Sequence, residues 1–107
     1  MRIQDTAIIP EEKITRYLLV PRIKDDKSKF LAQAGFTQDN PEELLKAIKQ
    51  LVMTTEAVKD SKNEYGIFYI IEGNLQGVNG HELTVVTVWL QSKDGESFRF
   101  ITLKPKK

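Results

Sequence analysis

The chain has 107 residues, of which 40% are hydrophobic and 29% are charged, and its formal net charge is +1. This length and composition are typical of one globular domain, predicted here to span residues 1–107, and the near-neutral charge argues against a chain that binds nucleic acid or membranes through a general electrostatic field. The absence of cysteine excludes disulfides, thiol catalysis and metal sites built on sulfur.

Other classes are excluded by single features. The lone histidine, His81, cannot form a site that needs two imidazoles. No apolar run approaches the roughly 20 residues that a membrane-spanning helix needs. We therefore expect a cytoplasmic protein without a metal, a cofactor or a membrane partner.

The first part of the chain, about residues 8–60, is predicted to be helical. A first helix is expected to begin near residues 10–12, where a proline and two acids suit a helix N-terminus. Its inner side chains would be Ile14, Tyr17 and Leu18, and Pro21 would end it.

A second, short helix is predicted to follow a cap at Asp25 or Asp26. It is expected to end at Gly35 in a left-handed conformation, with Phe36 as the apolar residue that accompanies such a cap. Its inner side chains would be Phe30, Leu31 and Ala34.

The third predicted helix has the clearest pattern. Asn40 is expected to cap it, Pro41 to begin it, and Glu43 to complete a capping box. An apolar stripe follows, made of Leu44, Leu45, Ile48, Leu51 and Val52. Whether residues 53–64 continue the helix or form a loop is left open.

From about residue 65 to residue 105 the pattern indicates an antiparallel β-meander. Residues 65–73, 82–91 and 97–104 are rich in residues that favour strands, and Asn79-Gly80 and Asp94-Gly95 are typical of two-residue hairpin turns. The predicted fold class is α+β, with the N-terminal helices packed on one face of a meander of three or four strands.

Two-residue turns would determine which residues lie opposite one another. They place Ile71 opposite Val88, Trp89 opposite Phe100, and Thr87 opposite Thr102. The face predicted to receive the helices then holds Ile67, Tyr69, Ile71, Val86, Val88, Leu90, Ile101 and Leu103. The other, mixed face holds Phe68, Ile70, Glu72, Thr87, Trp89, Phe100, Thr102 and Lys104.

The mixed face is the predicted functional surface, because an antiparallel sheet can leave one face in solvent. Its binding residues would be Trp89, Phe100, Thr87 and Lys104. A purely structural role is the alternative, since aromatic pairs and threonine pairs stabilise any sheet. A long first helical segment covering this face would make it a second small core.

The meander also resembles a known family. The resemblance is carried by Tyr69 to His81, Val86 to Trp89 and Phe100 to Pro105, together with Ile9 to Lys13 and Ser28 to Phe36. In these segments the chain resembles an uncharacterised bacterial domain family. Its members are small stand-alone proteins and C-terminal modules of polymorphic toxins. The order of elements is more remotely similar to ribonucleases of the barnase, EndoU, colicin and RelE type.

This remote similarity implies a metal-independent ribonuclease as one hypothesis. The catalytic residues would be Glu72 as the base, Thr102 as a donor to phosphate oxygens, and Lys29 as the phosphate-neutralising cation, with Arg99 as another candidate cation. Trp89 could stack a base of the RNA.

The second hypothesis is a non-enzymatic interaction module, or a member of a toxin–partner pair, that binds a small protein encoded nearby. It would use the mixed face, or an open edge offered by residues 65–73 or 97–104. The residues leave open whether the protein is an enzyme, what it binds and its oligomeric state.

Overall fold

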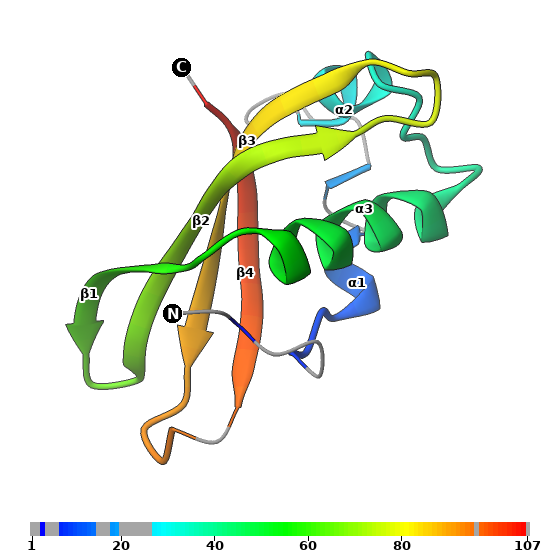
Figure 1. Ribbon diagram of the computed structural model, residues 1–107. Helices are drawn as coiled ribbons and strands as arrows, with labels where there is room; N and C mark the ends of the chain where they lie inside the picture. Colours follow the sequence, from blue (N-terminus) through cyan, green and yellow to red (C-terminus); the bar gives the residue numbers. More distant parts are fainter. Residues whose placement is uncertain (1–2, 4–6, 15–17, 20–26, 96, 107) are drawn as a thin grey trace.

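The computed structural model describes residues 3, 7–14, 18–19, 27–95 and 97–106. Helices precede strands along the chain, so the predicted α+β class is confirmed (Figure 1). The elements are α1 (Glu11–Lys13), α2 (Ser28–Ala32), α3 (Pro41–Thr54), β1 (Val58–Asn63), β2 (Gly66–Gln76), β3 (Glu82–Gln91) and β4 (Phe98–Pro105). The predicted roles of Tyr17, Pro21, Asp25 and Asp26 fall outside the described residues.

The four strands form one antiparallel sheet in the order β1-β2-β3-β4. The segment left open by the sequence is divided between two elements, because α3 ends at Thr54 and β1 begins at Val58. The sheet therefore begins before residue 65, and β2 is an inner strand that cannot offer the open edge predicted for residues 65–73 along its paired part, Gly66–Ile70.

Helix α3 is the amphipathic helix that covers the sheet. Its stripe is buried at Leu44, Ile48, Leu51 and Val52, whereas Leu45 is half-buried. Pro41 begins the helix as predicted, but Asn40 does not cap it with its side chain. The Asn40 amide oxygen instead accepts hydrogen bonds from Thr37 N (2.8 Å) and Thr37 Oγ1 (3.1 Å).

The predicted glycine cap after α2 is confirmed. Gly35 has a φ of 87°, Gly35 N donates to Ala32 O (3.0 Å), and Phe36 N donates to Leu31 O (3.2 Å). Phe36 is buried. This pair of bonds is the Schellman pattern, in which only glycine adopts the left-handed conformation without strain.

A short N-terminal segment lies along the outer edge of β4. Ile8 N donates to Phe98 O (2.8 Å), and Phe100 N donates to Ile8 O (2.8 Å), which makes a parallel bridge to Arg99. This part of the edge predicted for residues 97–104 is therefore already paired.

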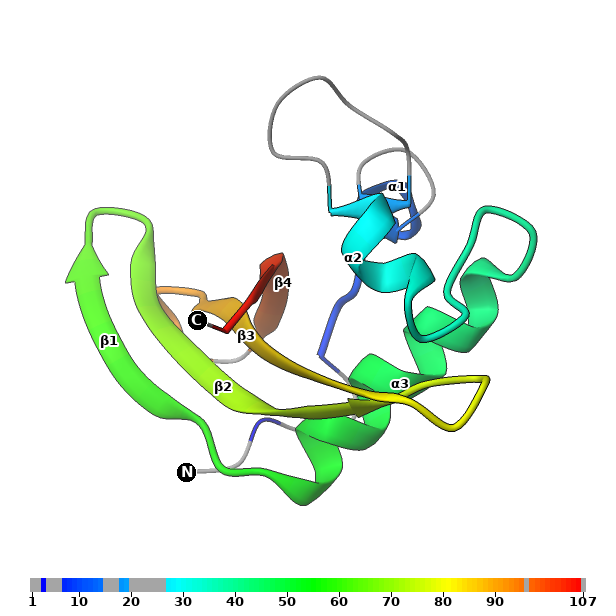
Figure 2. The ribbon, with the colours of Figure 1, turned by 90° about the horizontal axis from the view of Figure 1, so that it is seen from above.

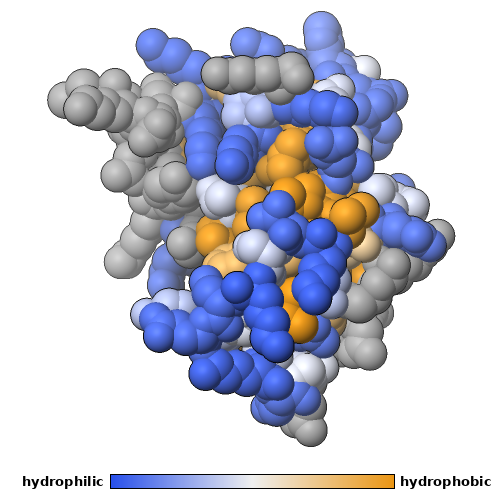
Figure 3. All heavy atoms as spheres, turned by 90° about the vertical axis from the view of Figure 1, so that its left-hand side faces the viewer, coloured by the Kyte–Doolittle hydropathy of each residue, from blue (hydrophilic) through white to orange (hydrophobic). Residues whose placement is uncertain are grey.

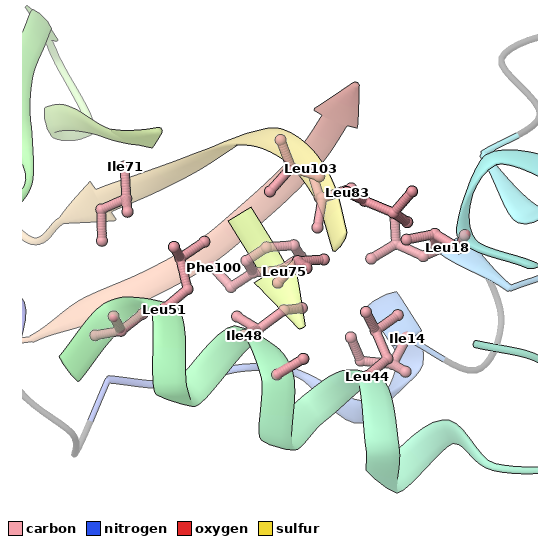
Figure 4. Close-up of a cluster of buried hydrophobic side chains, with 14 of the residues drawn as sticks. Ile14, Leu18, Leu44, Ile48, Leu51, Ile71, Leu75, Leu83, Phe100 and Leu103 are labelled. Carbon is pink, nitrogen blue, oxygen red and sulfur yellow. The ribbon is translucent and has the colours of Figure 1, made fainter. Parts of the chain in front are cut away.

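The core lies between the sheet and the helices, which gather on one side of it (Figure 2). Side chains of α3, among them Leu44, Ile48 and Leu51, point toward the strands (Figure 4). Ile14 and Leu18 of the N-terminal region complete this cluster. Among the described residues, no helix is both long enough and apolar enough to cross a membrane.

Candidate functional site

The pairing of β2 with β3 differs by one residue from the predicted register. Ile71 lies opposite Thr87, and Tyr69 lies opposite Trp89. The reason is the connection, because the last pair is Gln76 with Glu82, which leaves residues 77–81 as the loop in place of a two-residue turn. A slip of one residue moves every side chain of the partner strand to the other face.

Contacts of the hairpin tip with the end of α2 accompany this longer loop. Val78 N donates to Ala34 O (2.8 Å), and Asn79 Nδ2 donates to Gln33 O (3.1 Å). The register of the sheet is therefore coupled to a helix more than forty positions earlier in the chain.

The second hairpin is predicted correctly only near its turn. Gln91 with Phe98 and Trp89 with Phe100 pair as expected, but a β-bulge between Val88 and Trp89 shifts the remaining pairs. Thr87 consequently lies opposite Leu103 instead of Thr102.

The predicted surface position of Thr87, Trp89 and Phe100 is wrong. All three side chains are 0% exposed and lie on the face that packs against the helices. Thr87 Oγ1 donates to Ile71 O (3.1 Å) and accepts from Trp89 Nε1 (2.8 Å), and the rings of Trp89 and Phe100 meet edge to face at 5.3 Å. In this state they cannot form a docking or stacking surface.

The face of the sheet turned away from α3, here called the open sheet face, carries an unexpected set of side chains. Its centre is aliphatic and half-buried, because β3 turns its second set of apolar residues outward. We call Phe68, Ile70, Val86, Val88 and Leu90 the apolar patch. Figure 3, which views the left side of Figure 1, shows hydrophobic side chains gathered there with hydrophilic ones around them.

One end of the open sheet face is polar. Lys106 Nζ donates to Glu72 Oε2 (2.9 Å), with both side chains about half exposed, and Lys27 Nζ donates to Thr102 Oγ1 (2.9 Å). Glu72 and Lys104 both lie opposite Val86, on its two neighbouring strands. At about 4.8 Å per strand their Cα atoms are about 10 Å apart.

Glu72, Thr102 and Lys104 therefore lie on one face, as predicted, but Lys29 does not join them. Lys29 lines a shallow pocket of about 230 Å³ that also contacts Leu19 and Phe36. Among the described residues, it makes no hydrogen bond to Glu72 or Thr102. Lys27 is the lysine that donates a hydrogen bond to Thr102. Nothing in the sequence distinguished it from the neighbouring lysines.

Comparisons with known proteins place this geometry in context. The fold matches a chain from the "Contact-dependent growth inhibition toxin - immunity protein complex from Klebsiella pneumoniae 342", with a TM-score of 0.68 and 21% identity over 95% of each chain. A comparison with curated proteins finds no match. The model of the family described as "Domain of unknown function (DUF6883)" matches residues 2–107. The chain therefore belongs to the DUF6883 family.

Proposed function

We propose that this protein is one member of a pair of the toxin–immunity kind, and that its protein partner covers the open sheet face. The observation that carries the proposal is the composition of β3. Its inward side chains, Leu83, Val85, Thr87 and Trp89, are buried, and its outward ones include Val86, Val88 and Leu90. A strand that is apolar on both faces is typical of a sheet covered on both sides, whereas among the described residues the helices lie on one side of this sheet.

The fold comparison supports a pair. The matched chain comes from a toxin–immunity complex, and the match extends over nearly the whole of both chains. The apolar patch supports a protein as the second member, because contiguous apolar surface with a polar rim marks protein–protein contact.

The size of the face indicates how far a partner would extend. Four strands spaced by about 4.8 Å and eight residues at about 3.3 Å each cover roughly 500 Å². A stable interface needs about 800 Å² on each side. The partner would therefore reach beyond the apolar patch onto its charged rim.

The test uses the protein together with the product of the reading frame beside its gene, co-expressed and analysed by size and composition. We expect a complex, and we expect Val88→Glu to weaken it by at least about 100-fold, because a carboxylate would be buried without a partner. Tyr65→Glu, which adds the same charge at an exposed turn residue, is the matched control and should leave the affinity unchanged.

Thermal unfolding of the variant shows whether a loss of binding results from a loss of folding. Val88 is only half-buried, so the variant should fold. A folded Val88→Glu variant that binds as tightly as the wild type would place the partner elsewhere, and a wild-type chain that stays alone beside its neighbour's product would contradict the pair.

A metal-independent ribonuclease is the second candidate, favoured by the polar end of the open sheet face. Glu72 would take the proton of a ribose 2′-hydroxyl, whose oxygen attacks the phosphorus. The Lys27 ammonium group, held on Thr102, and the Lys104 ammonium group would neutralise the phosphate, and a lysine would return a proton to the leaving 5′-oxygen.

Cleavage of RNA in the presence of a metal chelator tests this candidate. Glu72→Gln should lower the rate by about 10²- to 10⁴-fold, as expected for a general base, and Thr102→Val should also lower it. Lys29→Met is the matched control for Lys27→Met, since of these two lysines Lys27 donates to Thr102 and Lys29 does not. RNA that stays intact with the folded wild-type protein would reject the enzyme.

A further inference from the structure

The two flanks of the apolar patch differ in charge, and the β4 flank is basic. Arg99 lies opposite Leu90, Lys104 lies opposite Val86, and Lys106 follows the strand. Residues 98–107 contain no acid. Among the described residues, neither Arg99 nor Lys104 forms an ion pair or a side-chain hydrogen bond.

The opposite flank does not supply the matching negative charge. A pocket of about 370 Å³ there is lined by Glu56, Val58, Lys59, Asp60, Ile70 and Glu72. Glu72 is already paired with Lys106, Glu56 also has a partner, and Asp60 Oδ2 accepts a hydrogen bond from Ser61 Oγ (3.5 Å). A second copy of the chain would therefore bring few unpaired carboxylates to β4.

The apolar patch on this face is poorly suited to nucleic acid. Single-stranded RNA is held by aromatic side chains on which bases stack, as well as by cations. Trp89 and Phe100 are buried, and Phe68 is the aromatic residue within the apolar patch. Aliphatic side chains at Ile70, Val86 and Val88 match apolar side chains of a protein better than they match phosphates.

From these observations we infer that the open sheet face binds an acidic protein segment, whose apolar side chains cover the patch while its carboxylates contact Lys104 and the other cations of β4. The inference rests on the proposed function and adds the chemistry of the partner. Arg99 and Lys104 are five residues apart along β4, so at about 3.3 Å per residue their Cα atoms are roughly 16 Å apart. Lys106 is paired with Glu72, so the carboxylates of one extended segment would contact Arg99 and Lys104.

The test uses two peptides with the same Leu-Val-Leu centre, one flanked on both sides by Glu-Glu and the other by Lys-Lys. Each is added at millimolar concentration to the isotope-labelled full chain, and backbone amide shifts are followed by NMR. The acidic peptide should shift the amides of Val86, Val88 and Lys104 in a saturable way, with an affinity at least about fivefold above that of the basic peptide.

Charge reversal gives the matched comparison. Lys104→Glu should weaken the acidic peptide by about fivefold, while Lys62→Glu on the exposed strand β1 should leave its affinity unchanged. Both lysines are exposed surface residues, so both variants should fold.

Each other result overturns the inference. Equal shifts with both peptides, or none with either, would remove the charge preference. Tighter binding of an oligouridine than of the acidic peptide would assign the face to RNA, and shifts that depend on protein concentration alone would assign it to a second copy. If these results occur while Val88→Glu still breaks the natural complex, the proposed function stands and only the acidic partner is rejected.

Discussion

Replacing Trp89 by alanine is expected to lower the free energy of unfolding by about 3–5 kcal/mol, the range for removing a fully buried aromatic side chain. Trp89 is 0% exposed and packs edge to face on Phe100. The substitution leaves a cavity beside that ring and removes the donor that satisfies Thr87 Oγ1. Because a domain is stable by only about 5–15 kcal/mol, a large part of its stability would be lost.

Chemical denaturation measures this loss, and two variants separate its causes. Trp89→Phe keeps most of the ring but removes the indole N–H, so it should cost markedly less than the alanine variant. Leu90→Ala, at the next residue but on the open sheet face, should cost about 1 kcal/mol. If Trp89→Ala were as stable as Leu90→Ala, the register described above would be wrong.

Leu44→Ala is expected to lower the free energy of unfolding by about 2–5 kcal/mol, because the Leu44 side chain of α3 is fully buried in the core. Leu45 is its matched control, with the same side chain one position further along the helix. Leu45 is half-buried and lines a pocket with Ile9 and Pro41. Truncating it removes less buried surface and should cost about 1 kcal/mol.

Equilibrium unfolding of the two leucine variants decides between two arrangements of α3. The sequence pattern places both leucines in one apolar stripe, whereas the structure separates a buried position from a half-buried one. Equal losses for the two variants would show that the helix is rotated from the orientation described here.

Substitutions of adjacent β3 residues should therefore have different effects, because such residues lie on opposite faces of the sheet. Substitutions at Thr87 and Trp89 should act on stability, and substitutions at Val88 and Leu90 should act on binding. This alternation along β3 lets stability and binding be measured separately within one strand.

Local features of the chain could be predicted from the sequence because they depend on neighbouring residues. The stripe of α3, the proline at its start, the left-handed Gly35 and the strand segments are set by periodicity, backbone freedom and residue preference over a few positions. The α+β class follows from the order of these elements along the chain.

The candidate site could be predicted only in part. Glu72, Thr102 and Lys104 lie on the face where the sequence placed them, but Lys27 was not found, because a contact across 75 positions leaves no local pattern. The aromatic residues were placed on the wrong side, since their side depends on a register that turn chemistry alone did not determine.

The sequence by itself determined α2, α3 and the strands β2 to β4, and the tertiary structure decided that residues 58–63 form β1 and which side of each strand is the core. The long loop at residues 77–81, docked on the end of α2, and the bulge at Val88/Trp89 select the register. Side chains alternate with a period of two, so a shift of one residue exchanges the faces. For this protein that exchange placed Trp89 in the core and Val88 on the open sheet face.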